Sequence, residues 1–168
     1  MIDIRAALPA DVPAILALIR ELAEYEKLTH LLAATEADID RELFGEHPVA
    51  ESLVARSGSD IVGFALYFHN MSTFLGRRGL WLEDLYVRPE HRRAGIGEAL
   101  LRSVARIAAD RGCGRFEWSV LDWNQPAIDF YRKLGADILP DWRICRVTGP
   151  ALTALAQSAE NGAKPRKT

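Results

Sequence analysis

The sequence predicts a layered α/β domain of the α+β type, in which helices pack against a mixed sheet. Stretches with strand-like alternation and stretches with helical periodicity follow one another along the chain, in the order β-α-α-β-β-β-α-β-α-β-β. The chain has 168 residues, of which 49% are hydrophobic, so it is long enough for one sizeable core and short for two. We therefore expect a single domain over residues 1–157.

A strand followed by a helix is expected at the N-terminus. Residues 1–7 can form a short strand. Asp11 and Pro13 suit the start of a helix, because a short polar residue and a proline are favoured in the first turn. The apolar stripe of this helix ends on a carboxylate, Glu26.

A second helix and a hairpin follow. Thr35 can cap a helix that stops at Gly45, since a threonine oxygen can accept a backbone N–H of the first turn. Residues 51–56 and 61–69 flank a Ser-Gly-Ser-Asp turn and are expected to pair as neighbouring strands. Residues 80–87 predict a further strand.

The remaining elements alternate between helix and strand. Gly95 begins a segment with a continuous apolar face, which predicts a helix that stops at Gly112. Residues 115–121 alternate apolar and polar side chains, as a strand does. Asn124 can cap the next helix, which Gly135 closes.

The C-terminal part is expected to contain one more strand, a short helix and a tail. The strand is predicted over residues 142–148, and the helix begins at Pro150. Residues 158–168 lose apolar periodicity and gain charge, glycine and proline, which is typical of a flexible tail.

Charge and cysteine usage limit the classes of partner. The 21 Lys+Arg and 23 Asp+Glu give a formal net charge of −2 without a long basic stripe, so a nucleic acid is not expected as a partner. A small cationic or neutral ligand fits better. Cys113 and Cys145 are far apart and not at metal-ligand spacing, so no metal is expected. With no signal peptide or long apolar span, we expect no membrane partner and a cytoplasmic location.

The run Arg92-Arg93-Ala94-Gly95-Ile96-Gly97 lies where a predicted strand gives way to a predicted helix. Glycines at such a place can simply mark the helix entry. However, the free N–H groups and the positive end of the helix dipole also make this place suitable for a pyrophosphate. A dinucleotide-binding loop is excluded because Leu100 stands where a third small residue is required, and a P-loop is excluded because Gly-Lys-Ser/Thr is absent.

The pattern Arg92-x-x-Gly95-x-Gly97 resembles the acetyl-CoA-binding signature of the GNAT acetyltransferase superfamily. The resemblance extends over IRAALPADVPAILALIRELAEYEKL, FGEHP, LEDLYV and LDWNQPAIDFYRKLGA. Within the superfamily, the chain resembles the spermidine/spermine (diamine) acetyltransferase group, and VLDWNQ together with Ser72-Thr73 resembles its thialysine acetyltransferase branch. This resemblance implies the GNAT fold with a mixed, mostly antiparallel twisted sheet, acetyl-CoA as co-substrate, and a homodimer.

The adjacent carboxylates of Glu83 and Asp84 are the first candidates for chemistry. Neighbours in a strand project to opposite faces, so at least one carboxylate should interrupt an apolar face. Either one face of the strand is exposed to solvent, or a carboxylate points into a substrate cleft. By resemblance, Glu83 is an amine-binding glutamate that takes a proton through water, with Asp84 as the lesser candidate.

Four more residues are expected to bind the amine by resemblance. Tyr25 and Glu26 match amine-contacting positions of the family, although on pattern alone Glu26 could be an exposed helix end. Ser72 and Thr73 precede the acidic strand. The spacing from Ser72 to Glu83 is one residue longer than in the thialysine branch, which predicts a different loop.

Tyr131 is the residue most strongly expected to act chemically. From its position on the helix face it could be a core aromatic, whose hydroxyl would still need a partner. By resemblance it is the general acid that protonates the departing CoA thiolate. Asn124 can cap its helix, and by resemblance the asparagine at this position also contacts CoA.

By resemblance, the backbone of Leu85–Val87 pairs with the pantetheine arm as an extra strand would. Arg92, Arg93 and Lys133 could meet phosphate or be solvated surface. The complete set of expected acetyl-CoA contacts is Leu85, Tyr86, Val87, Arg92, Arg93, Ala94, Gly95, Ile96, Gly97, Glu98, Asn124, Gln125, Pro126, Ala127, Tyr131 and Lys133.

The leading functional prediction is transfer of an acetyl group from acetyl-CoA to a primary amine of a small diamine, polyamine or lysine-like amino acid. The transfer would be direct, within a ternary complex. The segment from Gly135 to Trp142 is shorter than in polyamine acetyltransferases, which speaks against a long polyamine. The alternatives are a protein lysine or N-terminal acetyltransferase, and a non-catalytic acyl-CoA-binding module.

Overall fold

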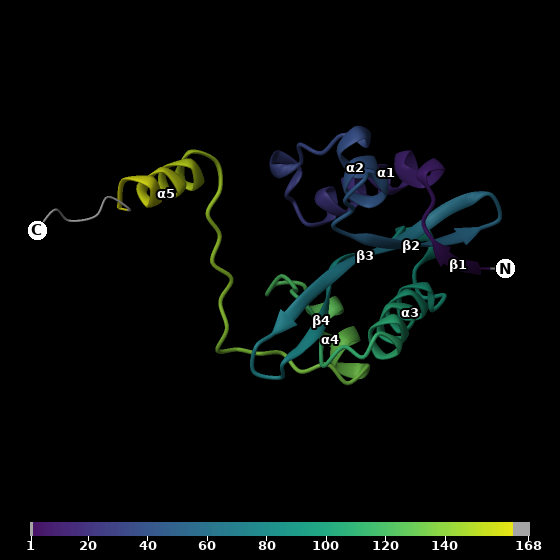
Figure 1. Cartoon of the computed structure of the whole chain (residues 1–168). Coiled ribbons are helices and arrows are strands. Elements are labelled where there is room, and N and C mark those ends of the chain that lie inside the picture. Colours follow the sequence, from purple (N-terminus) through teal and green to yellow (C-terminus); the bar gives the residue numbers. More distant parts are fainter. Residues whose placement is uncertain (1, 163–168) are drawn as a thin grey trace, which may run out of the picture. The chain divides into compact units, whose positions relative to one another are not determined.

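The computed structural model describes residues 2–162, and the chain divides into two compact units, Met1–Ser119 and Val120–Thr168 (Figure 1). The first unit contains the whole sheet and the predicted phosphate-binding loop. The second contains the helix with the predicted general acid.

The sheet of the first unit has five strands in the order β1-β2-β3-β4-β5. They are β1 (Ile2–Ala6), β2 (Glu51–Ser57), β3 (Asp60–Ser72), β4 (Arg77–Val87) and β5 (Phe116–Trp118). All neighbours are antiparallel except β4 and β5, which are parallel. The mixed, mostly antiparallel sheet is thus confirmed, and its one parallel pair requires a crossover, which a helix supplies.

Helices cover both faces of the sheet. Helices α1 (Val12–Tyr25) and α2 (Glu36–Phe44) lie on one face, and α3 (Ile96–Asp110), the crossover between β4 and β5, lies on the other (Figure 1). Short 3-10 turns occur at Pro9–Asp11, Thr29–Leu31 and Pro89–His91. The core between the sheet and α1 and α2 consists of Ala7, Ile15, Leu18, Leu43, Val54, Phe64 and Tyr86.

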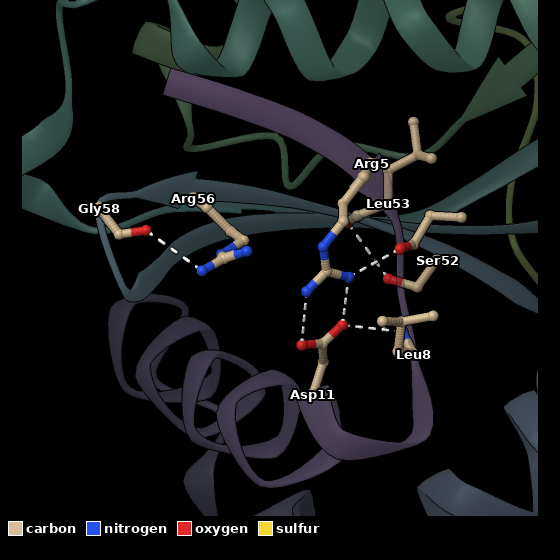
Figure 2. A network of polar contacts seen from close by, with 8 residues as sticks. Arg5, Leu8, Asp11, Ser52, Leu53, Arg56 and Gly58 are labelled. Carbon is tan, nitrogen blue, oxygen red and sulfur yellow. Dashed lines mark hydrogen bonds and ion pairs between the residues drawn. The ribbon is translucent and has the colours of Figure 1, made fainter. Parts of the chain in front are cut away.

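The starts of α1 and α2 are held by different side-chain contacts. Thr35 caps α2 as predicted, because its hydroxyl accepts the backbone N–H of Asp38, and the Asp38 carboxylate accepts the N–H of Thr35 in return. Asp11 lies at the start of α1, but its carboxylate accepts two bonds from Arg5 and one from the backbone N–H of Leu8 (Figure 2). Asp11 therefore ties the start of α1 to β1.

The second unit contains α4 (Gln125–Lys133) and α5 (Gly149–Gly162). The predicted strand at 142–148 is wrong, because no strand is assigned there within the described residues. An alternating pattern becomes a strand only where a second strand satisfies its backbone groups, and no described strand pairs with this segment. The strand predicted over 115–121 is shorter, Phe116–Trp118.

The expected C-terminal tail begins inside a helix. Helix α5 starts at Gly149, one residue before the predicted Pro150, and its backbone continues through residues 158–162. The remainder of the expected tail, 163–168, lies outside the described residues.

Candidate active site

The pairing of β3 with β4 is irregular at the predicted carboxylates, Glu83 and Asp84. Leu66 is opposite Asp84, but the next residue of β3, Tyr67, is opposite Leu82. Glu83 is therefore the extra residue of a β-bulge on β4. A bulge interrupts the alternation of side chains along the bulged strand and re-aims them.

Both carboxylates consequently face the same side of the sheet. Asp84 is opposite Leu66, which packs against the core under α1 and α2. Trp81 is opposite Phe68, two residues along β3 from Leu66 and hence on the same face. The indole Nε1 of Trp81 donates to Oε2 of Glu83 at 2.9 Å, which places Glu83 on that face too.

The prediction that Glu83 and Asp84 project to opposite faces is therefore wrong. It assumed regular alternation along β4, whereas the one-residue bulge changes the alternation between the two carboxylates.

The carboxylates influence each other electrostatically. Burial and, to a smaller extent, the negative charges of Glu83 and Glu26 together raise the pKa of Asp84 to about 7. Glu26, the C-cap residue that follows α1, has its own pKa raised by burial. Glu26, Glu83 and Asp84 form the cluster that we call the acidic site. Because burial and the neighbouring negative charges oppose the ionisation of Asp84, a cation placed among the three carboxylates would be stabilised.

Glu83 is held in one position by Trp81 although its side chain is exposed. A hydrogen bond to a charged group is worth about 1.5 kcal/mol at the low end, which suits an exposed site. Ordering a glutamate side chain costs about 1.5–2 kcal/mol in rotamer entropy. The two contributions are about equal, so the bond fixes the carboxylate while adding little to the stability of the fold.

Beside the acidic site, β4 has an open backbone edge. The pairing of β4 with β5 ends at Leu82 and Trp118. Among the strands of the described residues, none pairs with Leu85–Val87 on the side of β4 that faces β5. Backbone groups along this edge can therefore bind an extended ligand in the way that an added strand is bound. One of these groups already has a partner, because the carbonyl of Val87 accepts a hydrogen bond from Nε–H of Arg92 at 2.8 Å.

The glycine loop leads from this edge into α3. Arg93 and Gly95 both have left-handed backbones, with φ values of 65° and 78°. Gly95 precedes the first residue of α3, where the initial N–H groups lack carbonyl partners within the helix. A left-handed turn before a free helix N-terminus fits a pyrophosphate. Glu98, in the first turn, forms an ion pair with Arg102.

Arg92 has a structural role besides the two that the sequence suggested, contact with phosphate or exposure to solvent. Its guanidinium lies over the ring of Tyr25 at 5.0 Å and over the ring of Tyr86 at 5.3 Å, both measured to the ring centroid. These cation–π contacts, with the bond to Val87, connect the end of α1 to the end of β4. The positions of Arg92 and Tyr25 are far apart in the sequence, so only the fold could reveal this contact. Its contact with phosphate stays a prediction.

The second unit carries the remaining predicted residues. Asn124 caps α4, because its side-chain oxygen accepts the backbone N–H of Ala127 at 3.4 Å, as predicted. Tyr131 is buried in α4, and its ring centroid lies 5.3 Å from that of Phe130. Pro126 occupies the first turn, where it needs no N–H partner. Lys133 is exposed at the end of the helix.

Ser72 and Thr73 do not lie beside the acidic site within the first unit. They are at the tip of the β3–β4 hairpin, where the Ser72 hydroxyl accepts the N–H of Leu75 at 3.2 Å. Ser72 is five residues farther along β3 than Tyr67, which is beside the bulge. At about 3.3 Å per residue this is a separation of roughly 17 Å. Their contact with an amine stays a prediction.

His69 is on the face opposite the acidic site. It pairs with Leu80, which is buried on the α3 side, and its Nδ1 is 3.1 Å from the carbonyl of Gly79. Its Nε2 is 3.1 Å from the guanidinium of Arg111. Since arginine can only donate, Nε2 must be the acceptor and Nδ1 carries the proton. His69 is thus part of a polar cluster near the end of α3.

Among the helices of residues 2–162, none is long and apolar enough to cross a membrane.

The family model described as "Acetyltransferase (GNAT) family" matches residues 14–136. A thialysine N-epsilon-acetyltransferase of Sus scrofa is 43% identical over 164 residues, which cover 91% of this chain and 96% of that protein. An L-ornithine N5-acetyltransferase of Arabidopsis thaliana is 36% identical over 197 residues, with 90% and 86% covered.

Among solved structures, an integron cassette protein from the mobile metagenome of V. cholerae superposes with a TM-score of 0.78 at 26% sequence identity. The match covers 93% of this chain and 98% of that chain. It supports the same arrangement of sheet and helices.

Proposed function

Since the chain belongs to the GNAT acetyltransferase family, we propose that it transfers an acetyl group from acetyl-CoA to a primary amine of a small diamine, polyamine or lysine-like amino acid. The observation that carries the proposal is the acidic site, in which the bulge turns Glu83 and Asp84 to the same face as Glu26. Three carboxylates on one face suit an acceptor that arrives as an ammonium ion.

The acceptor must lose a proton before it can react. An alkylammonium with a pKa of ~10.4 lies about 3.4 units above pH 7, so its free base costs roughly 4.6 kcal/mol. Glu83 is exposed and held by Trp81, so it can take this proton through water. Asp84 and Glu26 hold the cation before deprotonation.

The transfer itself is direct. The amine nitrogen attacks the thioester carbonyl in a ternary complex, the C–N bond forms, and the C–S bond breaks as the tetrahedral intermediate collapses. The first ammonium proton has by then passed through water to Glu83. The CoA thiolate takes a proton from the hydroxyl of Tyr131. The nitrogen, positively charged after the attack, loses its second proton through water, which restores the Tyr131 hydroxyl, and Glu83 releases its proton to solvent. No covalent acyl-enzyme is needed.

The donor is proposed to lie along the open edge of β4 and the glycine loop. Backbone groups of Leu85–Val87 would bind the pantetheine arm and polarise the thioester carbonyl, and the N-terminus of α3 would bind the pyrophosphate. Asn124, Gln125, Pro126, Ala127 and Lys133 are proposed as contacts from α4.

The names of the relatives support one class of acceptor. Thialysine and ornithine, which the pig and Arabidopsis relatives are named for, are both amino acids with an amine at the end of a side chain. We propose such an amino acid as the first candidate, ahead of a polyamine. The active form is proposed to be a cytoplasmic homodimer.

A release assay for free CoA over a panel of acceptors tests the proposal. The panel contains thialysine, ornithine, lysine, putrescine, spermidine and a lysine-containing peptide. We expect the highest kcat/KM with one of the amino acids. Preference for the peptide would favour a protein acetyltransferase, and tight acetyl-CoA binding without release from any amine would favour a non-catalytic module.

Two variants test the assigned roles. Tyr131→Phe and Glu83→Gln should each lower kcat by about 10²- to 10⁴-fold, the usual contribution of a general acid or base, with little change in acetyl-CoA binding. Glu90→Gln, an exposed glutamate just beyond β4, is the matched control and should keep kcat. Unchanged turnover of Tyr131→Phe would remove the acid role from that residue.

A further inference from the structure

Trp81 makes a contact with the acidic site for which the sequence suggested no role. It is two residues before Glu83 on β4, and its indole Nε1 donates to Glu83 Oε2 at 2.9 Å. Trp81 is half-buried, and in the sheet register its backbone lies between Phe68 of β3 and Glu117 of β5.

The bulge makes a separate support for Glu83 necessary. As the extra residue on β4, Glu83 has no direct partner on β3. Its side chain is exposed, so packing does not select one rotamer. The bond from Trp81 is the contact that selects one, and it uses one lone pair of Oε2, so that Oε1 keeps both of its lone pairs for a water or an amine.

The chemistry of the indole suits this task. An indole N–H is a donor only, so it cannot take a proton from the carboxyl group or compete for the proton that leaves the amine. It also bonds best to the ionised carboxylate, which is the form that a base must have before the reaction.

We propose that Trp81 is a positioning residue that holds Glu83 in the orientation needed to accept the amine proton. The proposal rests on the role of Glu83 as the base in the proposed function. It adds a residue that touches neither acetyl-CoA nor the reacting atoms and acts through Glu83 alone.

The test is a double-mutant cycle of Trp81→Phe and Glu83→Gln, measured with ornithine or thialysine as acceptor. In the parent protein, W81F should lower kcat about tenfold and leave the KM for acetyl-CoA within twofold. In the E83Q background, W81F should change kcat by less than twofold, because the group that it positions is already gone. W118F, a tryptophan of β5, is the control and should keep kcat within twofold.

A second variant distinguishes loss of the N–H donor from a folding defect caused by W81F. Trp81→3-benzothienylalanine replaces the indole N–H by sulfur in a ring of nearly the same shape. It should reproduce the loss of kcat, since it removes only the donor. Full kcat in this variant would overturn the proposal, and so would an equal loss from W81F in both backgrounds.

The outcomes separate this proposal from the function on which it rests. If E83Q lowers kcat and W81F does not, only the role of Trp81 is overturned. If E83Q itself keeps full kcat, the base role of Glu83 is lost and the role of Trp81 with it.

Discussion

Replacing the half-buried Asp84 by asparagine should change how the stability of the protein depends on pH. The pKa of Asp84 is raised from 3.8 to about 7, chiefly by burial and then by the charges of Glu83 and Glu26. A shift of about 3 units corresponds to a penalty of about 4 kcal/mol once the carboxylate is ionised in the folded state. Because Asp84 keeps some exposure to solvent, this value is an upper bound.

The sign follows from proton binding. Between pH 4 and pH 7 the folded protein holds a proton on Asp84 that the unfolded chain has released, so the free energy of unfolding falls as pH rises through this window. With these two pKa values the penalty grows by about 3 kcal/mol between pH 5 and pH 8. Asparagine is neutral throughout, so Asp84→Asn should gain about this much stability relative to the parent over the same interval.

Urea unfolding of both proteins at pH 5 and at pH 8 measures this difference. Asp60→Asn, at an exposed position at the start of β3, is the control and should show no such gain. A stability difference between Asp84→Asn and the parent that is the same at both pH values would refute the raised pKa. A bound diamine should oppose the penalty, because its ammonium stabilises the ionised carboxylate.

Two further substitutions test contacts within the first unit. Gly63→Ala would place a Cβ 2.8 Å from the backbone oxygen of Tyr86, so we expect a loss of about 1–3 kcal/mol in urea unfolding and a higher KM for acetyl-CoA. In Gly97→Ala the nearest atom is 3.8 Å away, so this variant is the control for stability alone and should keep the parent's free energy of unfolding. Asp11→Asn should cost about 2–4 kcal/mol at pH 7, since Asp11 is buried and accepts bonds from Arg5. Arg5 lowers the pKa of Asp11, so this cost should shrink as pH falls below about 4, and a constant cost would contradict the ion pair.

Local patterns in the sequence predicted most of the elements because each depends on neighbouring residues. The cap at Thr35, the stop at Gly45 and the cap at Asn124 are set by side chains within three or four positions of the backbone groups that they satisfy. The strand predicted at 142–148 failed because a strand needs a partner, and alternation alone does not supply one.

The contacts that define the acidic site depended on the fold. Arg92 meets Tyr25 only because α1 ends beside the end of β4, and the two residues are remote in the sequence. The bond between Trp81 and Glu83 could have been suspected, since residues two apart in a strand share a face. That rule, however, applies only where the strand is regular.

The sequence by itself determined the layered fold class and, through the glycine loop and the segments around it, the resemblance to the acetyltransferases. Only the tertiary structure decided that Glu83 and Asp84 share a face. The bulge arises from the register between β3 and β4, and register is set by how two strands pair. The same carboxylates in an unbulged β4 would lie on opposite sides of the sheet, and the acidic site would not exist.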